Sequence, residues 1–214
     1  ISTFNNLVEE SKNYKNMAVL TGYELELSKA LKQGSDAWLN NPRVPREASG
    51  TSGMTASMNG SVNLSTDDGW IPEYAKHGVN SFVVPKGDYA NMSVFDQDNY
   101  DFEKLYDILE NEVLPMYYDR PNEWRQVVKN AMDDVKDRIG QAAALLVEDG
   151  MVIGLGTGST ASCFIRALAK RFEDEGLNIV TVASSHASEK LARDLGLPTV
   201  SIDAIETIDI TFDG

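Results

Sequence analysis

Two glycine-rich loops, far apart in the chain, constrain its fold more than any other feature. The first, Glu47-Ala-Ser-Gly-Thr-Ser-Gly53, leads into a predicted helix, and the second, Gly154-Leu-Gly-Thr-Gly-Ser-Thr160, joins an apolar strand to a predicted helix. The free backbone N–H groups at such a helix start bind phosphate or sugar oxygens. The sequence therefore predicts two separate ligand-binding loops, which belong to two different folds.

The second half of the chain alternates apolar segments with amphipathic ones. The pattern predicts helices over 136–149, 159–172 and 185–195, and strands over 151–155, 179–183, 199–202 and 208–212. Alternation of strands and helices in this order is typical of a parallel, doubly wound sheet.

The first half is predicted to form another α/β unit. Its pattern predicts strands over 16–21, 37–39, 62–64 and 79–85, and helices over 23–33, 54–60, 101–114 and 122–133. We place the boundary at 131–136, inside helical sequence, although natural linkers are more often rich in Pro, Gly or Ser. The predicted fold class is α/β, with two partial Rossmann-like units that have truncated parallel sheets, over residues 1–133 and 136–214.

Composition excludes several classes of function. The 214 residues carry a formal net charge of −14, which disfavours nucleic acid and anionic membranes, because both are bound through Lys and Arg. No apolar run reaches the ~18–20 residues of a membrane span, and the N-terminus has no signal-peptide pattern. Cys163 is the single cysteine, so no disulfide framework is possible and a cytoplasmic location is expected. His77 and His186 lie far apart, and no metal site is predicted.

The sequence around the second loop resembles the N-terminal part of ribose-5-phosphate isomerase A. The matching motifs are the Gly-Thr-Gly-Ser-Thr loop, the Ser-Ser pair after the next strand, and Asp209-Ile-Thr-Phe-Asp213-Gly214. The family converts ribose 5-phosphate into ribulose 5-phosphate, an aldose–ketose isomerisation. The resemblance implies that a sugar phosphate is held by residues of the loop and of the serine pair: Gly156, Thr157, Gly158, Ser159, Thr160, Ser184 and Ser185.

Isomerisation is not expected from this half alone. The reaction needs a base within hydrogen-bond reach of the C2 proton, and the family's Lys-Gly-Gly-Gly segment and its Glu base lie beyond Gly214. Asp213 matches the first Asp of the family's Asp-Gly-Ala-Asp motif and is the remaining candidate, although an Asp at a strand end more often caps a turn. Apart from the resemblance, the same loop is also compatible with a tight turn that binds nothing. Its spacing is that of neither an ATP-binding nor an NAD-binding loop.

The first loop and its flanks are similar to the α-glucan (glycogen or starch) phosphorylases and their glycogen-synthase-like relatives. The similarity extends from Gly34-Ser-Asp-Ala-Trp38 through the loop to Asp67-Asp-Gly-Trp70, and covers about residues 1–133. These are two-lobed glycosyltransferases with the active site between Rossmann-like domains. The resemblance implies that Glu47 binds glucose hydroxyls and that Ala48, Ser49 and Gly50 line the sugar and phosphate site. Thr51 and Ser52 would lie near a cofactor phosphate.

One residue departs from the phosphorylase pattern. Phosphorylases carry the lysine that binds pyridoxal phosphate directly after the Met of this loop, where this chain has Thr55. Because a Thr hydroxyl cannot form a Schiff base, we expect no covalent pyridoxal phosphate, and no other cofactor is predicted. The opposing lobe, whose basic residues stabilise the leaving phosphate, has no counterpart here.

The sequence leaves three interpretations open. The chain is a fusion or fragment of two carbohydrate enzymes, inactive by itself; a module that binds a sugar phosphate without catalysis; or an artificial or mis-joined reading frame. The expected partners are a sugar phosphate and, from the first resemblance, an α-glucan. The oligomeric state is left open.

Overall fold

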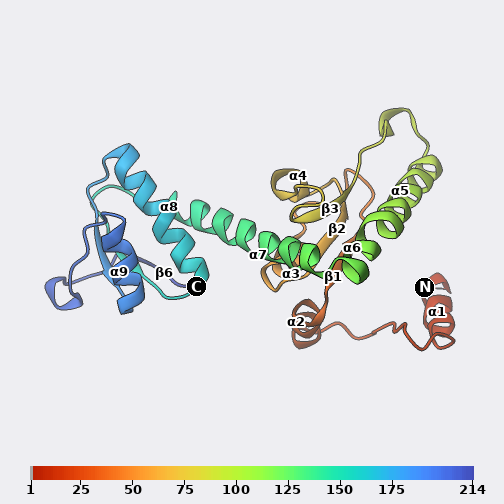
Figure 1. Cartoon of the computed structure of the whole chain (residues 1–214), viewed down its shortest axis with the longest axis horizontal. Helices are drawn as coiled ribbons and strands as arrows, with labels where there is room; N and C mark the ends of the chain where they lie inside the picture. Colours follow the sequence, from red (N-terminus) through yellow and green to blue (C-terminus); the bar gives the residue numbers. More distant parts are fainter. Residues whose placement is uncertain (1) are drawn as a thin grey trace.

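The chain forms two small α/β units joined by one long helix (Figure 1). The computed structural model describes residues 2–214, with side-chain surroundings from Phe4 onward. Ile1, the first residue of the N-terminal segment in which no signal-peptide pattern was found, lies outside the described residues. The helices and turns are α1 Ser2–Ser11, α2 Leu25–Gly34, α3 Thr51–Met58, α4 Ile71–Tyr74, η1 Tyr89–Asn91, α5 Val94–Ile108, the π-helical η2 Leu109–Val113, α6 Leu114–Asp119, α7 Pro121–Ala144, α8 Ser159–Glu175, α9 His186–Asp194 and η3 Ile202–Ala204.

Each unit has a parallel sheet of three strands. The first consists of β1 Ala37–Asn40, β2 Val62–Thr66 and β3 Ser81–Val84 in the order β1-β2-β3. The second consists of β4 Val152–Leu155, β5 Val180–Ala183 and β6 Ile210–Phe212 in the order β5-β4-β6. The strand that precedes the second loop, β4, is thus the central strand of its sheet. The predicted α/β class with partial Rossmann-like units is confirmed.

The central strands are buried, as expected for strands covered on both faces. All five residues of β2 are buried, and the core beside it contains Phe82, whose ring lies parallel to that of Trp124 at 6.4 Å. In the second unit, Ile153 and Leu155 of β4 pack with Phe164 of α8, and the Phe164 and Phe212 ring centroids are 4.2 Å apart. Each unit therefore has a hydrophobic core of its own.

Helix α7 contributes to the cores of both units. Its first half buries Trp124 and Val127 against the first sheet, and its second half buries Ala144 in the second core. Gly140 is where α7 crosses α8: a Cβ there would lie 2.6 Å from the backbone carbon of Cys163. Close packing of the two backbones thus requires a glycine at this position.

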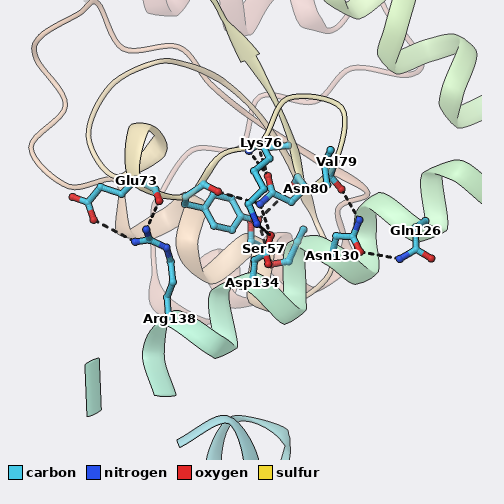
Figure 2. A network of polar contacts seen from close by, with 12 residues as sticks. Ser57, Glu73, Lys76, Val79, Asn80, Gln126, Asn130, Asp134 and Arg138 are labelled. Atoms are coloured by element: carbon cyan, nitrogen blue, oxygen red, sulfur yellow. Dashed lines mark hydrogen bonds and ion pairs between the residues drawn. The ribbon is translucent and has the colours of Figure 1, made fainter. Parts of the chain in front are cut away.

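Polar contacts fix α7 to the loop between α4 and β3 (Figure 2). Asn80 Nδ2 donates to Asp134 Oδ2 at 2.7 Å, and the buried Tyr74 hydroxyl donates to the Ala131 carbonyl at 3.2 Å. Asn130 Nδ2 donates to the Val79 carbonyl at 2.9 Å, one turn earlier on the helix. The orientation of α7 on the first unit is therefore set by directional bonds as well as by apolar packing.

Several predicted elements differ in the structure. Residues 16–21 form no strand, because this stretch lies on the surface without a neighbouring strand, with Leu20 54% exposed. The predicted strand over 199–202 is reduced to one bridge between Thr181 and Thr199, followed by the 3₁₀ turn η3. The helices predicted over 122–133 and 136–149 are one helix, α7, which ends at Ala144. Helix α5 begins seven residues before the predicted start at 101, after a capping box between Ser93 and Asp96.

Candidate functional site

The residues predicted around the second loop lie at the carboxyl ends of three neighbouring strands. Thr157 follows β4, Ser184 follows β5 and Asp213 follows β6. The hydroxyls of Thr157 and Ser184 are 3.0 Å apart, and the Thr157 N–H donates to Asp213 Oδ1 at 2.9 Å. Ligands of open parallel sheets bind beyond the carboxyl ends of the strands. The structure thus brings these three residues together at the edge where a ligand is expected.

Two glycines of the second loop are required by the backbone. A Cβ on Gly156 would lie 2.5 Å from the Phe212 carbonyl oxygen, because the Gly156 N–H donates to that oxygen at 2.7 Å. Gly158 has a φ of +115°, which side chains other than hydrogen rarely allow. The Gly-Thr-Gly sequence therefore fits the loop tightly beside β6.

Helix α8 starts directly after this loop without a side-chain cap. The first N–H group of α8 that bonds within the helix is that of Ser162, which donates to the Gly158 carbonyl at 3.0 Å. The N–H groups of Ser159 and Thr160, which precede it, therefore have no intrahelical acceptor. The Ser159 side chain is exposed and that of Thr160 is half-buried. An anion at this helix start would meet free N–H groups and the positive end of the helix dipole.

The serines after β5 have different roles. Ser185 caps α9, since its hydroxyl accepts from the Ser188 N–H at 3.2 Å, whereas the exposed Ser184 faces Thr157. The sequence did not single out Ser188, which is buried and donates its hydroxyl to the Gly156 carbonyl at 2.6 Å. The sequence signal that could have indicated Ser188 is its position three residues after the helix cap Ser185. Ser188 couples α9 to the loop.

The Asp213 carboxylate is negatively charged at neutral pH. Hydrogen bonds from the backbone N–H groups of Thr157 and Gly214 lower its pKa below the usual value. A carboxylate with a lowered pKa binds protons weakly and is a poor general base at neutral pH. In this geometry Asp213 orders the loop, and its charge lies beside the helix start that would receive a phosphate.

The first loop is held by the turn that follows β2. The Glu47 N–H donates to Asp68 Oδ2 at 2.8 Å, and the Trp70 N–H donates to the Ser49 carbonyl at 3.0 Å. Gly50 has a φ of +84° and lies against the buried Trp70 indole, 2.8 Å from where a Cβ would be. Glu47 is half-buried, while Ala48 and Ser49 are exposed. The predicted sugar-binding residues therefore form one ordered loop, in which Ala48 and Ser49 face solvent and Gly50 is buried.

The residues predicted near a cofactor phosphate line one hollow beside α3. Thr51, Ser52 and Thr55 face it, together with Trp38 of β1 and Lys32 of α2, and its volume is about 520 Å³. The Thr55 hydroxyl donates to the Thr51 carbonyl at 2.9 Å, within its own helix. The hollow is large enough for a small ligand. Thr55 offers no amine for covalent attachment, so the hollow does not fit a cofactor held through this residue.

Two buried polar atoms lie beneath the first loop. Asn63 Nδ2 donates to the Gly53 carbonyl at 3.0 Å and to Ser57 Oγ at 2.6 Å, whereas Asn63 Oδ1 and Trp70 Nε1 have no partner among the described residues. Asn63 was not singled out from the sequence. A polar side chain between the apolar residues Val62 and Leu64 is the signal that marks it.

The two histidines each lie beside one glutamate. His77 Nε2 lies 2.7 Å from Glu112 Oε2, and His186 is exposed on α9. Within residues 2–214, no group of three His, Cys, Asp or Glu side chains could hold a metal ion. No helix in this part of the chain is both long and apolar enough to cross a membrane.

The chain is similar to two different enzymes. It is 41% identical over 133 residues to a maltodextrin phosphorylase of Thermococcus litoralis, a match that covers 61% of this chain and 16% of that enzyme. It is 49% identical over 83 residues to ribose-5-phosphate isomerase A of Streptococcus thermophilus, which covers 39% of this chain and 37% of the isomerase. Both resemblances seen in the sequence are thus confirmed.

The chain is also similar to a solved structure of the isomerase. The ribose 5-phosphate isomerase A of Methanocaldococcus jannaschii is 44% identical over 38% of this chain and 36% of its own, with a TM-score of 0.37. No family model matches. The chain spans less than two fifths of the length of each of these relatives.

Proposed function

We propose that the second loop binds a sugar phosphate. The observation that carries this proposal is the meeting of Thr157, Ser184 and Asp213 beyond three parallel strands, beside the uncapped start of α8. The phosphate would accept from the N–H groups of Ser159 and Thr160, and the Thr157 and Ser184 hydroxyls would bind sugar oxygens. The similarity to ribose-5-phosphate isomerase A supports ribose 5-phosphate as the ligand.

Titration calorimetry with ribose 5-phosphate tests this proposal. We expect saturable binding at a stoichiometry of one for each chain, weakened about tenfold or more by Ser184→Ala together with Thr157→Val, because each lost hydrogen bond is worth about 1 kcal/mol. Ser201→Ala, on an exposed serine before η3, is the matched control. Absence of binding at millimolar ribose 5-phosphate would contradict the proposal.

We propose further that this chain does not isomerise its ligand. Asp213 is the candidate base, and its lowered pKa makes it a weak one. Incubation of the chain with ribose 5-phosphate should therefore yield no ribulose 5-phosphate above the rate in buffer. Turnover that disappears in Asp213→Asn would show that Asp213 is catalytic after all.

For the first loop we propose glucose or α-glucan binding without glucosyl transfer. The ordered Glu47–Gly50 loop and the similarity to maltodextrin phosphorylase support it. Addition of a maltodextrin should shift the nuclear magnetic resonance signals of this loop. In Glu47→Gln the same addition should leave these signals unshifted. Shifts confined to other surfaces would contradict the assignment. Release of glucose 1-phosphate from the maltodextrin in phosphate buffer would contradict the absence of transfer.

We also propose that the chain carries no covalently bound pyridoxal phosphate. The hollow beside α3 contains one amine among its lining residues, that of Lys32. After incubation with pyridoxal phosphate and borohydride reduction, peptide mass analysis should find Lys32 labelled no more than Lys190, an exposed lysine of α9. Preferential labelling of Lys32 would contradict the proposal.

We propose, finally, that the chain is a fusion of parts of two carbohydrate enzymes and that it is cytoplasmic. The two similarities and the single cysteine support these statements. Continuous sequencing of the source DNA across the codons for residues 125–145 tests the fusion. A break in the reading frame there would identify two separately encoded pieces.

A further inference from the structure

Helix α5 presents an unpartnered aromatic face flanked by carboxylates. Phe95, Phe102 and Tyr106 follow one another at helical spacing and are 70%, 58% and 46% exposed. Three carboxylates of the helix already have partners: Asp96 is in the capping box, Asp98 forms an ion pair with Arg43, and Asp101 accepts from the Tyr89 hydroxyl. Glu103 and Asp107 have no ion-pair partner among residues 4–214. We call Phe95, Phe102 and Tyr106, together with Glu103 and Asp107, the α5 face.

The groove between α7 and α8 has the opposite character. It is about 570 Å³ in volume and is lined by Ala144 at the end of α7, by Leu145 directly after it, and by Ala167, Arg166 and Lys170 of α8. The two alanines leave room for a side chain, and Leu145 at the rim is 71% exposed. Arg166 and Lys170 are exposed and have no ion-pair partner among residues 2–214. We call this the α7–α8 groove.

Other charged side chains around the groove do not cancel this character. Arg171 pairs with Glu175 and donates to the carbonyls of Ala144 and Val147, so its charge is partly neutralised. Asp137 at the other end is the one carboxylate of the lining. The groove is therefore a basic surface in a chain whose net charge is −14.

We propose that the α5 face of one copy of this chain docks in the α7–α8 groove of a second copy. Aromatic side chains would enter the space above the alanines, and the flanking carboxylates would meet Arg166 and Lys170. Contact between two α5 faces is disfavoured, because it would place like charges opposite each other. The association is between different surfaces and therefore runs head to tail.

Sedimentation velocity over a range of chain concentrations tests this first. The average mass should rise with concentration, and should continue beyond two chains, since each added copy leaves one face and one groove free. The ionic strength is held constant, because salt screens both the attraction between the two surfaces and the repulsion between chains of net charge −14. A chain that stays monomeric at millimolar concentration overturns the proposal.

Two variants each remove one surface. Phe102→Ser alters the α5 face and Arg166→Glu alters the groove; both side chains are exposed, so the fold should be kept, as circular dichroism would show. Each variant alone should associate at least ~10-fold more weakly, as expected when a central contact of an interface is removed. The matched controls Leu25→Ser and Lys190→Glu change exposed residues elsewhere and should associate as the unaltered chain does.

A mixture of the two variants decides between different and identical surfaces. The Arg166→Glu chain keeps an intact α5 face, and the Phe102→Ser chain keeps an intact groove. The mixture should therefore form a 1:1 dimer that grows no further, at concentrations where each variant by itself, weakened at least ~10-fold, is monomeric. A mixture that stays monomeric, or a Phe102→Ser chain that still polymerises, overturns the proposal.

Discussion

At the scale of single residues, the second loop depends on the charge of Asp213. Its folded-state pKa is lowered by the Thr157 and Gly214 N–H groups, so the carboxylate stabilises the folded state above the unfolded-state pKa of about 4. This contribution is lost as the pH falls through the folded-state pKa. Asp213→Asn should therefore be less stable than the unaltered chain at pH 7 and equally stable near pH 2.

Urea unfolding of both chains at several pH values measures this difference. Asp203→Asn, an exposed aspartate in the 3₁₀ turn η3, is the control for loss of one negative charge. If the gap between Asp213→Asn and the unaltered chain did not close in acid, the two N–H groups would not be what stabilises the charged form.

Cys163, in the α7–α8 groove, should react slowly with alkylating reagents. Burial, and secondly the neighbouring Asp137 carboxylate, raise the pKa of its thiol to about 11, whereas a free thiol has a pKa of about 8.5. Since the thiolate is the reactive form, the rate of iodoacetamide labelling should keep rising with pH beyond 9. A plateau near pH 8.5 would contradict this expectation. A glutathione sample measured alongside gives the reference curve.

At the scale of elements, close packing where α7 crosses α8 should outweigh helix propensity in deciding the effect of a substitution at Gly140. Alanine normally stabilises a helix interior relative to glycine by up to ~1 kcal/mol. At Gly140 the added Cβ would lie 2.6 Å from the α8 backbone, so Gly140→Ala should instead destabilise the chain by about 1–3 kcal/mol.

Gly34 at the end of α2 provides the matched control. A Cβ there meets nothing within 4 Å, and its φ is not positive, so Gly34→Ala should be neutral or stabilising. Denaturant unfolding measures both variants. Equal effects at the two positions would mean that α7 and α8 are not in close backbone contact.

The elements found from the sequence were those whose apolar pattern matched their burial. β2 and β4 were predicted from the apolar residues Val62, Leu64, Ile153 and Leu155, and these residues are buried in the structure. The loops after the two strands were predicted from the glycines that mark turns. Residues 16–21 have a similar apolar composition but no sheet neighbour, which a local pattern does not report. The continuity of α7 was missed because its two halves bury different faces in two cores.

The candidate site was predictable in part for the same reason. Thr157, Ser184 and Asp213 each follow a strand, and parallel strands bring their carboxyl ends together. The sequence did not indicate that Asp213 would accept from Thr157, nor that Ser188 would hold the loop from α9. Those contacts depend on loop geometry, which spacing along the chain does not determine.

At the scale of the whole molecule, α7 makes the two units mechanically dependent. Trp124 and Val127 belong to one core and Ala144 belongs to the other. The polar network at Asn80 and Asp134 fixes the helix to the first unit (Figure 2). Helix α7 joins the two sheets without a flexible linker. Disruption of α7 would therefore remove packing from both cores at once.

Net charge is the property of the whole molecule with the clearest consequence for stability. The chain has 33 acidic and 19 basic residues, and this excess of like charge destabilises a compact state. Salt screens that repulsion. It also screens exposed ion pairs such as Lys129–Asp133, but each of these is worth only about 0–1 kcal/mol. The repulsion should dominate, so the melting temperature should rise between low ionic strength and 0.15 M salt.

The size of that rise follows from the size of the chain. If screening stabilises the fold by about 1 kcal/mol, the melting temperature should increase by ~2–4 °C. The measurement belongs at low chain concentration, because head-to-tail association would stabilise the fold by mass action and would itself depend on salt. Near the isoelectric point of about 4.5 the repulsion vanishes, and the salt effect should vanish with it. A salt effect of equal size at that pH would mean that ion-specific binding, and not net charge, controls the stability.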